Sequence, residues 1–240
     1  MESKAVWQKR IETNLEIVRQ RIAQAAQRAG REPEDVHIVV VTKTFDAEVV
    51  RAVVAAGLTD IGENRVQEAE AKRAVLDDLQ GVRWHMVGHL QRNKAHRALE
   101  LFDFIHSVDR LSLAKALERR LAPQERVVPV LLEVNVGEEA SKYGFAPQAK
   151  ILDPAVEAVL ALPHLRLEGL MTVAPLVDDS EEVRPVFRRL RELYEGLQAR
   201  YPEAPWAHLS MGMTDDYAVA VEEGATMVRL GRALLGERQR

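Results

Sequence analysis

Lys43 is the first side chain in the sequence whose position suggests chemistry. It follows the β-branched run HIVVVT and shares the period-two face of Val39 and Val41. Inside a barrel, burial would favour the neutral amine, and a neutral amine can attack a carbonyl carbon to form a Schiff base. The structural alternative is a lysine that reaches the rim or pairs with a carboxylate such as Glu63.

Two glycine-containing segments near the C-terminal end carry groups that can hold a phosphate. Residues 210–215 read SMGMTD and residues 229–233 read RLGRA. Backbone N–H groups, hydroxyls and a following helix can together bind an anion, and barrel enzymes often build phosphate sites after strands seven and eight. Helix capping by the Ser and Thr is the alternative. The candidate residues are Ser210, Gly212, Met213, Thr214, Gly231 and Arg232.

Arg229 lies two residues before Gly231, so both share one face of the last strand. An inward arginine needs an acceptor, which is either a core carboxylate or a ligand. Pyridoxal 5'-phosphate would satisfy all three features, because it offers an aldehyde to Lys43, a phosphate to the two loops and a ring nitrogen to Arg229. An arginine there would keep that nitrogen unprotonated and weaken the cofactor as an electron sink.

Two other strand ends carry polar residues. Asn64 stands in the segment GENR, where it can face a ligand or, more commonly, cap the next helix. His89 stands in GHLQRNK, where it can act as an acid or base or simply as a polar rim residue. The chain has no cysteine that could ligate a metal ion, and we predict no metal site.

Strand-like and helix-like segments alternate along the chain. An amphipathic helix over residues 1–30 precedes eight strand–helix units, which predict a parallel (β/α)8 TIM barrel, of the α/β class, with an extra N-terminal helix. We expect one domain over residues 1–240, with that helix packed on the barrel. The predicted strands are 37–43, 60–64, 83–88, 104–108, 128–136, 167–173, 208–212 and 226–231. The predicted helices between them are 46–56, 65–79, 92–101, 111–121, 149–162, 181–200 and 215–223. An open doubly wound sheet would usually carry a glycine-rich loop after its first strand, and TKTFD is not one.

Composition excludes several classes of protein. The net charge is −4 and no long basic block is present, so nucleic acid is not expected as a partner. The N-terminus lacks an apolar signal region and no apolar run approaches bilayer length, so we expect neither secretion nor a membrane partner. The absence of cysteine favours the cytoplasm.

The sequence resembles the pyridoxal phosphate homeostasis protein family, alanine-racemase-like barrels without the second domain of the racemase. The resemblance spans nearly the whole chain and rests on VVVTKTF, DIGENRVQE, WHMVGHLQRNK, EVNVGEEASKYGF, LEGLMTVAP, LSMGMTDDY and VRLGRALLG. It implies that Lys43 is the Schiff-base lysine and that Arg229 faces the ring nitrogen. It also implies that Asn64 and Met171 lie against the cofactor, and that the loops at 210–214 and 231 hold the phosphate.

The resemblance implies binding of pyridoxal 5'-phosphate in vitamin B6 homeostasis, without catalysis. Racemisation needs a second acid–base group, which the racemases take from an additional domain, and we expect none after Arg240. The local candidates are His89, His208 and Tyr143. A small racemase or lyase is the alternative, and a barrel that forms a Schiff base with a sugar phosphate is a third reading. Pyridoxal-phosphate-dependent apo-enzymes are possible recipients of the cofactor, and we expect a monomer or a weak dimer.

Overall fold

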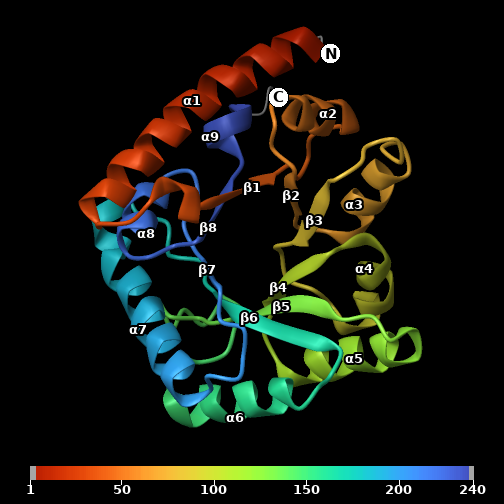
Figure 1. Cartoon of the computed structure of the whole chain (residues 1–240), viewed down its shortest axis with the longest axis vertical. Coiled ribbons are helices and arrows are strands. Elements are labelled where there is room, and N and C mark those ends of the chain that lie inside the picture. Colours follow the sequence, from red (N-terminus) through yellow and green to blue (C-terminus); the bar gives the residue numbers. More distant parts are fainter. Residues whose placement is uncertain (1–3, 238–240) are drawn as a thin grey trace.

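The computed structural model, which describes residues 4–237, confirms the predicted barrel. Within these residues eight parallel strands form a closed sheet in sequence order, and β1 pairs with both β2 and β8 (Figure 1). The strands are β1 His37–Val41, β2 Asp60–Glu63, β3 Arg83–Met86, β4 Phe104–Val108, β5 Val128–Glu133, β6 Leu165–Met171, β7 His208–Ser210 and β8 Met227–Leu230. The predicted bounds of 1 and 240 lie outside the described residues.

The helices form a ring around the sheet (Figure 1). They are α1 Lys4–Arg28, α2 Ala47–Ala55, α3 Val66–Arg73, α4 Ala95–Leu101, α5 Leu111–Leu121, α6 Ala149–Leu160, α7 Arg184–Arg200, α8 Tyr217–Glu222 and α9 Arg232–Leu235. The predicted helix 65–79 is too long, because the chain leaves α3 at Arg73 and turns so that Leu76 returns to the core. Two other predicted helices begin as 3-10 turns, at 92–94 and 180–183. Among the helices of residues 4–237, none combines the length and the apolar character that a bilayer crossing requires.

The N-terminal helix α1 packs on the outside of the barrel. Its side chains Ile11, Leu15, Val18 and Ile22 recur every three or four residues, and all four are buried. They face α2, α8 and α9, the helices beside the seam where the barrel closes (Figure 1). The side-chain amide of Asn14 donates a 2.9 Å hydrogen bond to the carbonyl of Leu234 in α9, which adds a polar contact to the apolar packing of α1.

Apolar side chains fill both sides of the sheet. The larger cluster lies between the strands and the helices, as expected for strands that alternate their side chains. A smaller cluster, formed by Phe104, Leu131, Met171 and Met227, comes from four different strands and fills the barrel interior. The barrel is therefore packed, and the space for a ligand lies at the ends of its strands.

Gly169 allows β6 and β7 to approach each other. An added Cβ at this position would lie 1.8 Å from the carbonyl oxygen of His208, and the residue has a φ of +153° beside an irregularity in the β5–β6 pairing. We expect Gly169→Ala to lower the free energy of unfolding by about 3 kcal/mol or more, because backbone must move to admit the methyl group.

Gly196→Ala is the matched control, since within 4 Å the new Cβ would meet only the guanidinium end of the Arg200 side chain, and no backbone outside its own helix α7. It should be neutral or raise stability by up to about 1 kcal/mol. Urea unfolding of the two variants measures both effects, and equal stabilities would contradict the proposed packing at Gly169.

Candidate functional site

A cavity of about 360 Å³ opens where the strands end at the C-terminal mouth of the barrel. Seven of the ten residues predicted from the sequence line it: Lys43, Asn64, Met213, Thr214, Arg229, Gly231 and Arg232. They come from the ends of β1, β2, β7 and β8, so the closed barrel brings together segments that are almost 190 residues apart. The apolar wall is formed by Val41, Val87, Val173 and Leu176.

The other three predicted residues occupy different places. Met171 belongs to the apolar cluster of the barrel interior. Ser210 is fully buried, and its Oγ lies 2.7 Å from Arg229 Nη1 and 3.0 Å from His106 Nδ1. Gly212 has a φ of +89°, and a Cβ there would come within 2.6 Å of the Ala220 side chain. These residues therefore support the floor of the cavity and do not form its lining.

The prediction that Lys43 ends a strand with a buried amine is wrong. Strand β1 ends at Val41, and Lys43 is exposed in the turn that follows, where it lines the cavity. The strand ends early because the Thr42 carbonyl accepts from the N–H of Phe45, and Thr44 adopts a φ of +68°. The amine thus stands at the rim, within the wall of the cavity.

A buried ion pair holds this turn in place. Lys72 Nζ donates to a carboxylate oxygen of Glu63 and, at 2.6 Å, to the Thr42 carbonyl oxygen. The Thr42 hydroxyl donates to the same Glu63 oxygen at 2.5 Å. Glu63 therefore pairs with Lys72, and the alternative in which it pairs with Lys43 does not hold. Breaking such a buried pair usually costs several kcal/mol, so the backbone that carries Lys43 is firmly anchored.

Arg229 points inward, as its spacing from Gly231 predicts, and is 5% exposed. Its guanidinium donates to Ser210 Oγ and to the Thr172 carbonyl oxygen, each at 2.7 Å. Burial lowers the pKa of Arg229 to about 10, an effect that the charges of Asp216 and Glu133 oppose. The side chain therefore remains a cation at neutral pH. Within residues 4–237 it forms no ion pair with a carboxylate.

The loops after β7 and β8 are bound to each other. Thr214 Oγ1 accepts from the backbone N–H of Ala233 at 3.2 Å, and Arg232 pairs with Asp215 at 2.5 Å. Thr214 therefore does not cap the helix that follows it, α8, but its hydroxyl caps the first turn of α9 across the two loops. One expected anion donor is already used, since the N–H of Met213 donates to the Asp216 carboxylate at 2.6 Å.

A second group of polar side chains lies beside Asn64, which also lines a neighbouring cavity with His89. His89 Nδ1 lies 2.9 Å from Asp109 Oδ2, and its ring stacks on Tyr143 with the centroids 3.6 Å apart. The side chain of Asn64 does not cap α3. The capping alternative therefore fails at this position too.

Several buried polar residues were not predicted from the sequence. They are Lys72, His85, His106, Glu133 and Asp216, together with the half-buried Asp60 at the opposite end of the barrel. A signal existed for three of them, because His85, His106 and Glu133 share the inward face of their strands with Val87, Phe104 and Leu131. Among residues 4–237 no group of His, Asp and Glu side chains is arranged to hold a metal ion.

Comparison with known proteins places the chain in a family. Residues 13–239 match the family described as alanine racemase, N-terminal domain. The pyridoxal phosphate homeostasis protein of Aquifex aeolicus is 44% identical over 225 residues, which are 94% of this chain and 97% of the relative. The chain belongs to the pyridoxal phosphate homeostasis protein family.

Solved structures agree with this membership. PipY of Synechococcus elongatus, determined with pyridoxal phosphate bound, is 36% identical with a TM-score of 0.82, over 94% of this chain and all of PipY. Alanine racemase of Clostridium difficile shares the fold, with a TM-score of 0.74 at 16% identity, but this chain matches only 60% of it. The matched part of that racemase chain thus has the same barrel fold as this chain.

Glu133, at the end of β5, is a buried carboxyl group. It is 7% exposed, and within residues 4–237 its Oε2 has no hydrogen-bond partner. Burial, together with the charge of Asp109, raises the pKa of Glu133 to about 7. A carboxyl group with a raised pKa stabilises the fold below its unfolded pKa of 4.5, and that contribution is lost as pH rises through 7.

We therefore expect Glu133→Gln to become more stable relative to the wild type as pH rises from 4.5 to 8. The relative gain is up to about 3 kcal/mol, from the size of the pKa shift. Urea unfolding of both proteins at the two pH values measures it, and a stability difference that does not change with pH would refute the raised pKa.

Proposed function

We propose that the cavity at the C-terminal mouth binds pyridoxal 5'-phosphate, and that the chain holds this cofactor for vitamin B6 homeostasis without turning over a substrate. One observation carries the proposal: an amine, a buried guanidinium and two glycine-containing loops that are hydrogen-bonded to each other surround a single cavity. Its volume of about 360 Å³ lies in the range of small-molecule sites. The names of the relatives and the ligand of PipY support the choice of cofactor.

The residues present fit the chemical groups of the cofactor. Lys43 places an exposed amine at the rim of the cavity, and Arg229 places a cation in its floor. Asn64 contributes a polar side chain to the wall, and Met213 contributes an apolar one. We assign the phosphate to Thr214, Gly231 and Arg232. When bound, the cofactor supplies an aldehyde with which the Lys43 amine can form a Schiff base, with loss of one water molecule.

The charge of Arg229 favours a protein that holds the cofactor over an enzyme that uses it in catalysis. A buried guanidinium that keeps its charge at neutral pH opposes a second positive charge beside it. Arg229 would therefore leave a neighbouring pyridine nitrogen unprotonated, which weakens the capacity of the ring to stabilise a carbanion. Transfer to apo-enzymes that need the cofactor, a cytoplasmic location and a monomeric or weakly dimeric state belong to the same proposal.

Lys43 is expected to carry the cofactor. Purified wild-type protein mixed with pyridoxal 5'-phosphate should gain a visible absorbance band, and borohydride reduction should fix one cofactor mass on the peptide that contains Lys43. Lys43→Ala should lose both signals. Lys115→Ala, on the exposed side of α5, is the matched control and should keep them. A wild type that stays colourless, or a label on another lysine, would refute the assignment.

The second candidate, a small racemase or lyase, is favoured by one observation: His89 lies beside Asn64 at the mouth. His208 is a poor acid–base candidate, because it begins β7 and its ring contacts His37 at the start of β1. Our proposal predicts no exchange of the α-hydrogen of amino acids in deuterated water, measured by proton NMR with loaded protein. Exchange that His89→Gln abolishes would establish the enzyme instead.

A further inference from the structure

Polar side chains form a continuous line through the barrel interior. His85 on β3 and His106 on β4 are both fully buried, and His85 Nδ1 lies 2.9 Å from His106 Nε2. At one end, His106 Nδ1 lies 3.0 Å from Ser210 Oγ, which is 2.7 Å from Arg229 Nη1. At the other end, His85 Nε2 lies 2.8 Å from Asp60 Oδ1. The line thus joins a cation at the C-terminal mouth to a carboxylate at the start of β2.

Only one assignment of hydrogens satisfies every contact in this line when both imidazoles are neutral and Asp60 is ionised. A carboxylate can only accept, so His85 donates from Nε2 to Asp60 and its Nδ1 accepts from His106 Nε2–H. His106 Nδ1 then has no hydrogen and accepts from the hydroxyl of Ser210. The oxygen of that hydroxyl accepts from the Arg229 guanidinium, which has donors only. All the donors point the same way, from the cation to the carboxylate, and hydrogen bonds aligned in this manner strengthen one another.

The charges of the interior agree with this assignment. Burial lowers the pKa of both His85 and His106, that of His106 well below its usual value, so neither ring gains a proton near neutral pH. Burial tends to raise the pKa of Asp60, but hydrogen bonds from His85 and Arg83 outweigh it and hold the value at about 2. Asp60 therefore remains a carboxylate, which can accept but not donate.

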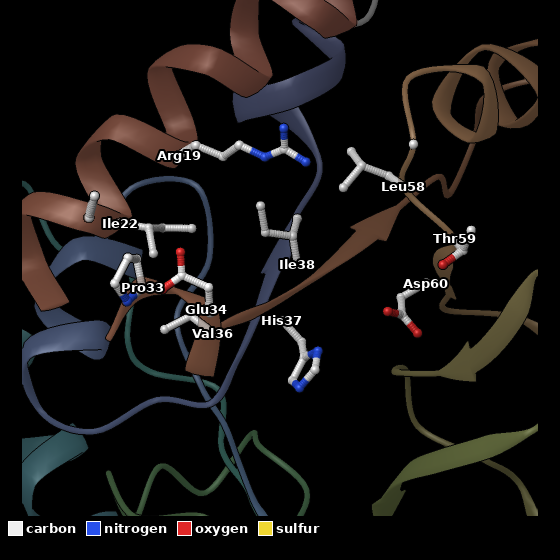
Figure 2. Close-up of a pocket in the computed structure, with 12 residues that line it drawn as sticks. Arg19, Ile22, Pro33, Glu34, Val36, His37, Ile38, Leu58, Thr59 and Asp60 are labelled. Atoms are coloured by element: carbon white, nitrogen blue, oxygen red, sulfur yellow. The ribbon is translucent and has the colours of Figure 1, made fainter. Parts of the chain in front are cut away.

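Asp60 opens onto a second cavity, far along the barrel from the candidate site. This cavity, of about 420 Å³, lies between α1, the 3-10 turn at 33–35 and the first residues of β1 and β2. Figure 2 shows His37 and Asp60, which come from neighbouring strands, among the side chains that line this cavity. The anchoring end of the line is therefore reachable from solvent without passing through the candidate site, and it can be altered without touching the cavity that Arg229 lines.

We propose that Asp60, His85 and His106 are positioning residues for the cofactor site, which fix the hydroxyl of Ser210 and, through it, the guanidinium of Arg229 from the opposite end of the barrel. This inference rests on the proposed function, since it takes the cavity at Arg229 as the site of pyridoxal 5'-phosphate. Without the carboxylate, the imidazoles can take the reverse tautomers. His106 would then present Nδ1–H to Ser210, and the hydroxyl would have to turn away.

Long-range ¹⁵N–¹H NMR of the histidine side chains in cofactor-free wild type tests the assignment of hydrogens along this line of side chains. We expect His85 and His106 both to be neutral, with the hydrogen on Nε2. A hydrogen on Nδ1 of either ring, or a charged ring at pH 7, would overturn the inference. This measurement needs neither a variant nor the cofactor, so it is decided separately from the proposed function.

The affinity for pyridoxal 5'-phosphate tests whether Asp60 affects the cofactor site. Asp60→Leu should weaken binding of pyridoxal 5'-phosphate roughly 2- to 10-fold, the usual effect of one hydrogen bond, and should shift the absorbance band of the bound cofactor. Asp60→Asn keeps an acceptor and should restore most of both. Arg83→Gln is the control, because it removes the 2.7 Å ion pair to Asp60 but leaves the contact with His85. Equal affinity and an unchanged band in Asp60→Leu would overturn the inference.

A double-mutant cycle separates positioning from general loss of structure. If Asp60 acts through Ser210, then Asp60→Leu should cause no further loss of affinity in a Ser210→Ala background. Additive losses would mean that the two residues act independently and would overturn the inference. Wild-type protein that does not bind the cofactor at all would overturn the proposed function as well, whereas binding that is insensitive to Asp60 would overturn this inference alone.

Discussion

The contact between the buried guanidinium of Arg229 and its two acceptors constrains the whole C-terminal mouth of the barrel. Burying a charged guanidinium costs several kcal/mol of free energy unless its N–H groups are hydrogen-bonded. The fold therefore requires both acceptors. Ser210 ends β7 and Thr172 follows β6, and both bind the same side chain of β8. The backbone N–H of Arg229 also binds the carbonyl of Gly212. The three strand ends are therefore held in one arrangement, around which the cavity forms.

Much of this arrangement can be predicted from periodicity. Period-two alternation in β8 indicated an inward Arg229, and the stripe on α1 indicated a helix packed on the barrel. The turn after β1 could not be predicted in this way. The carbonyl of Thr42 binds Lys72, which lies 30 residues further on, and Thr44 adopts a left-handed backbone, so Lys43 stands at the rim and not inside. Partners across the barrel depend on strand register, which the spacing within one strand does not report.

The contacts of Ser210 show why the direction of its hydroxyl could not be predicted from the residues next to it in the sequence. A serine before a glycine and a helix is typical of an anion loop or a cap, and both readings place its hydroxyl outside the barrel. In the structure the hydroxyl turns inward, because two buried groups from β4 and β8 need a partner that can both accept and donate.

The proposed function requires one small molecule to contact both Lys43 at the rim and Arg229 in the floor. A crystal structure of the protein grown with pyridoxal 5'-phosphate tests this most directly. We expect continuous density from Lys43 Nζ into the cofactor, with the ring nitrogen in hydrogen-bond contact with the Arg229 guanidinium and the phosphate between the loops after β7 and β8. Density at another lysine, or a cofactor whose ring nitrogen lies away from Arg229, would contradict it.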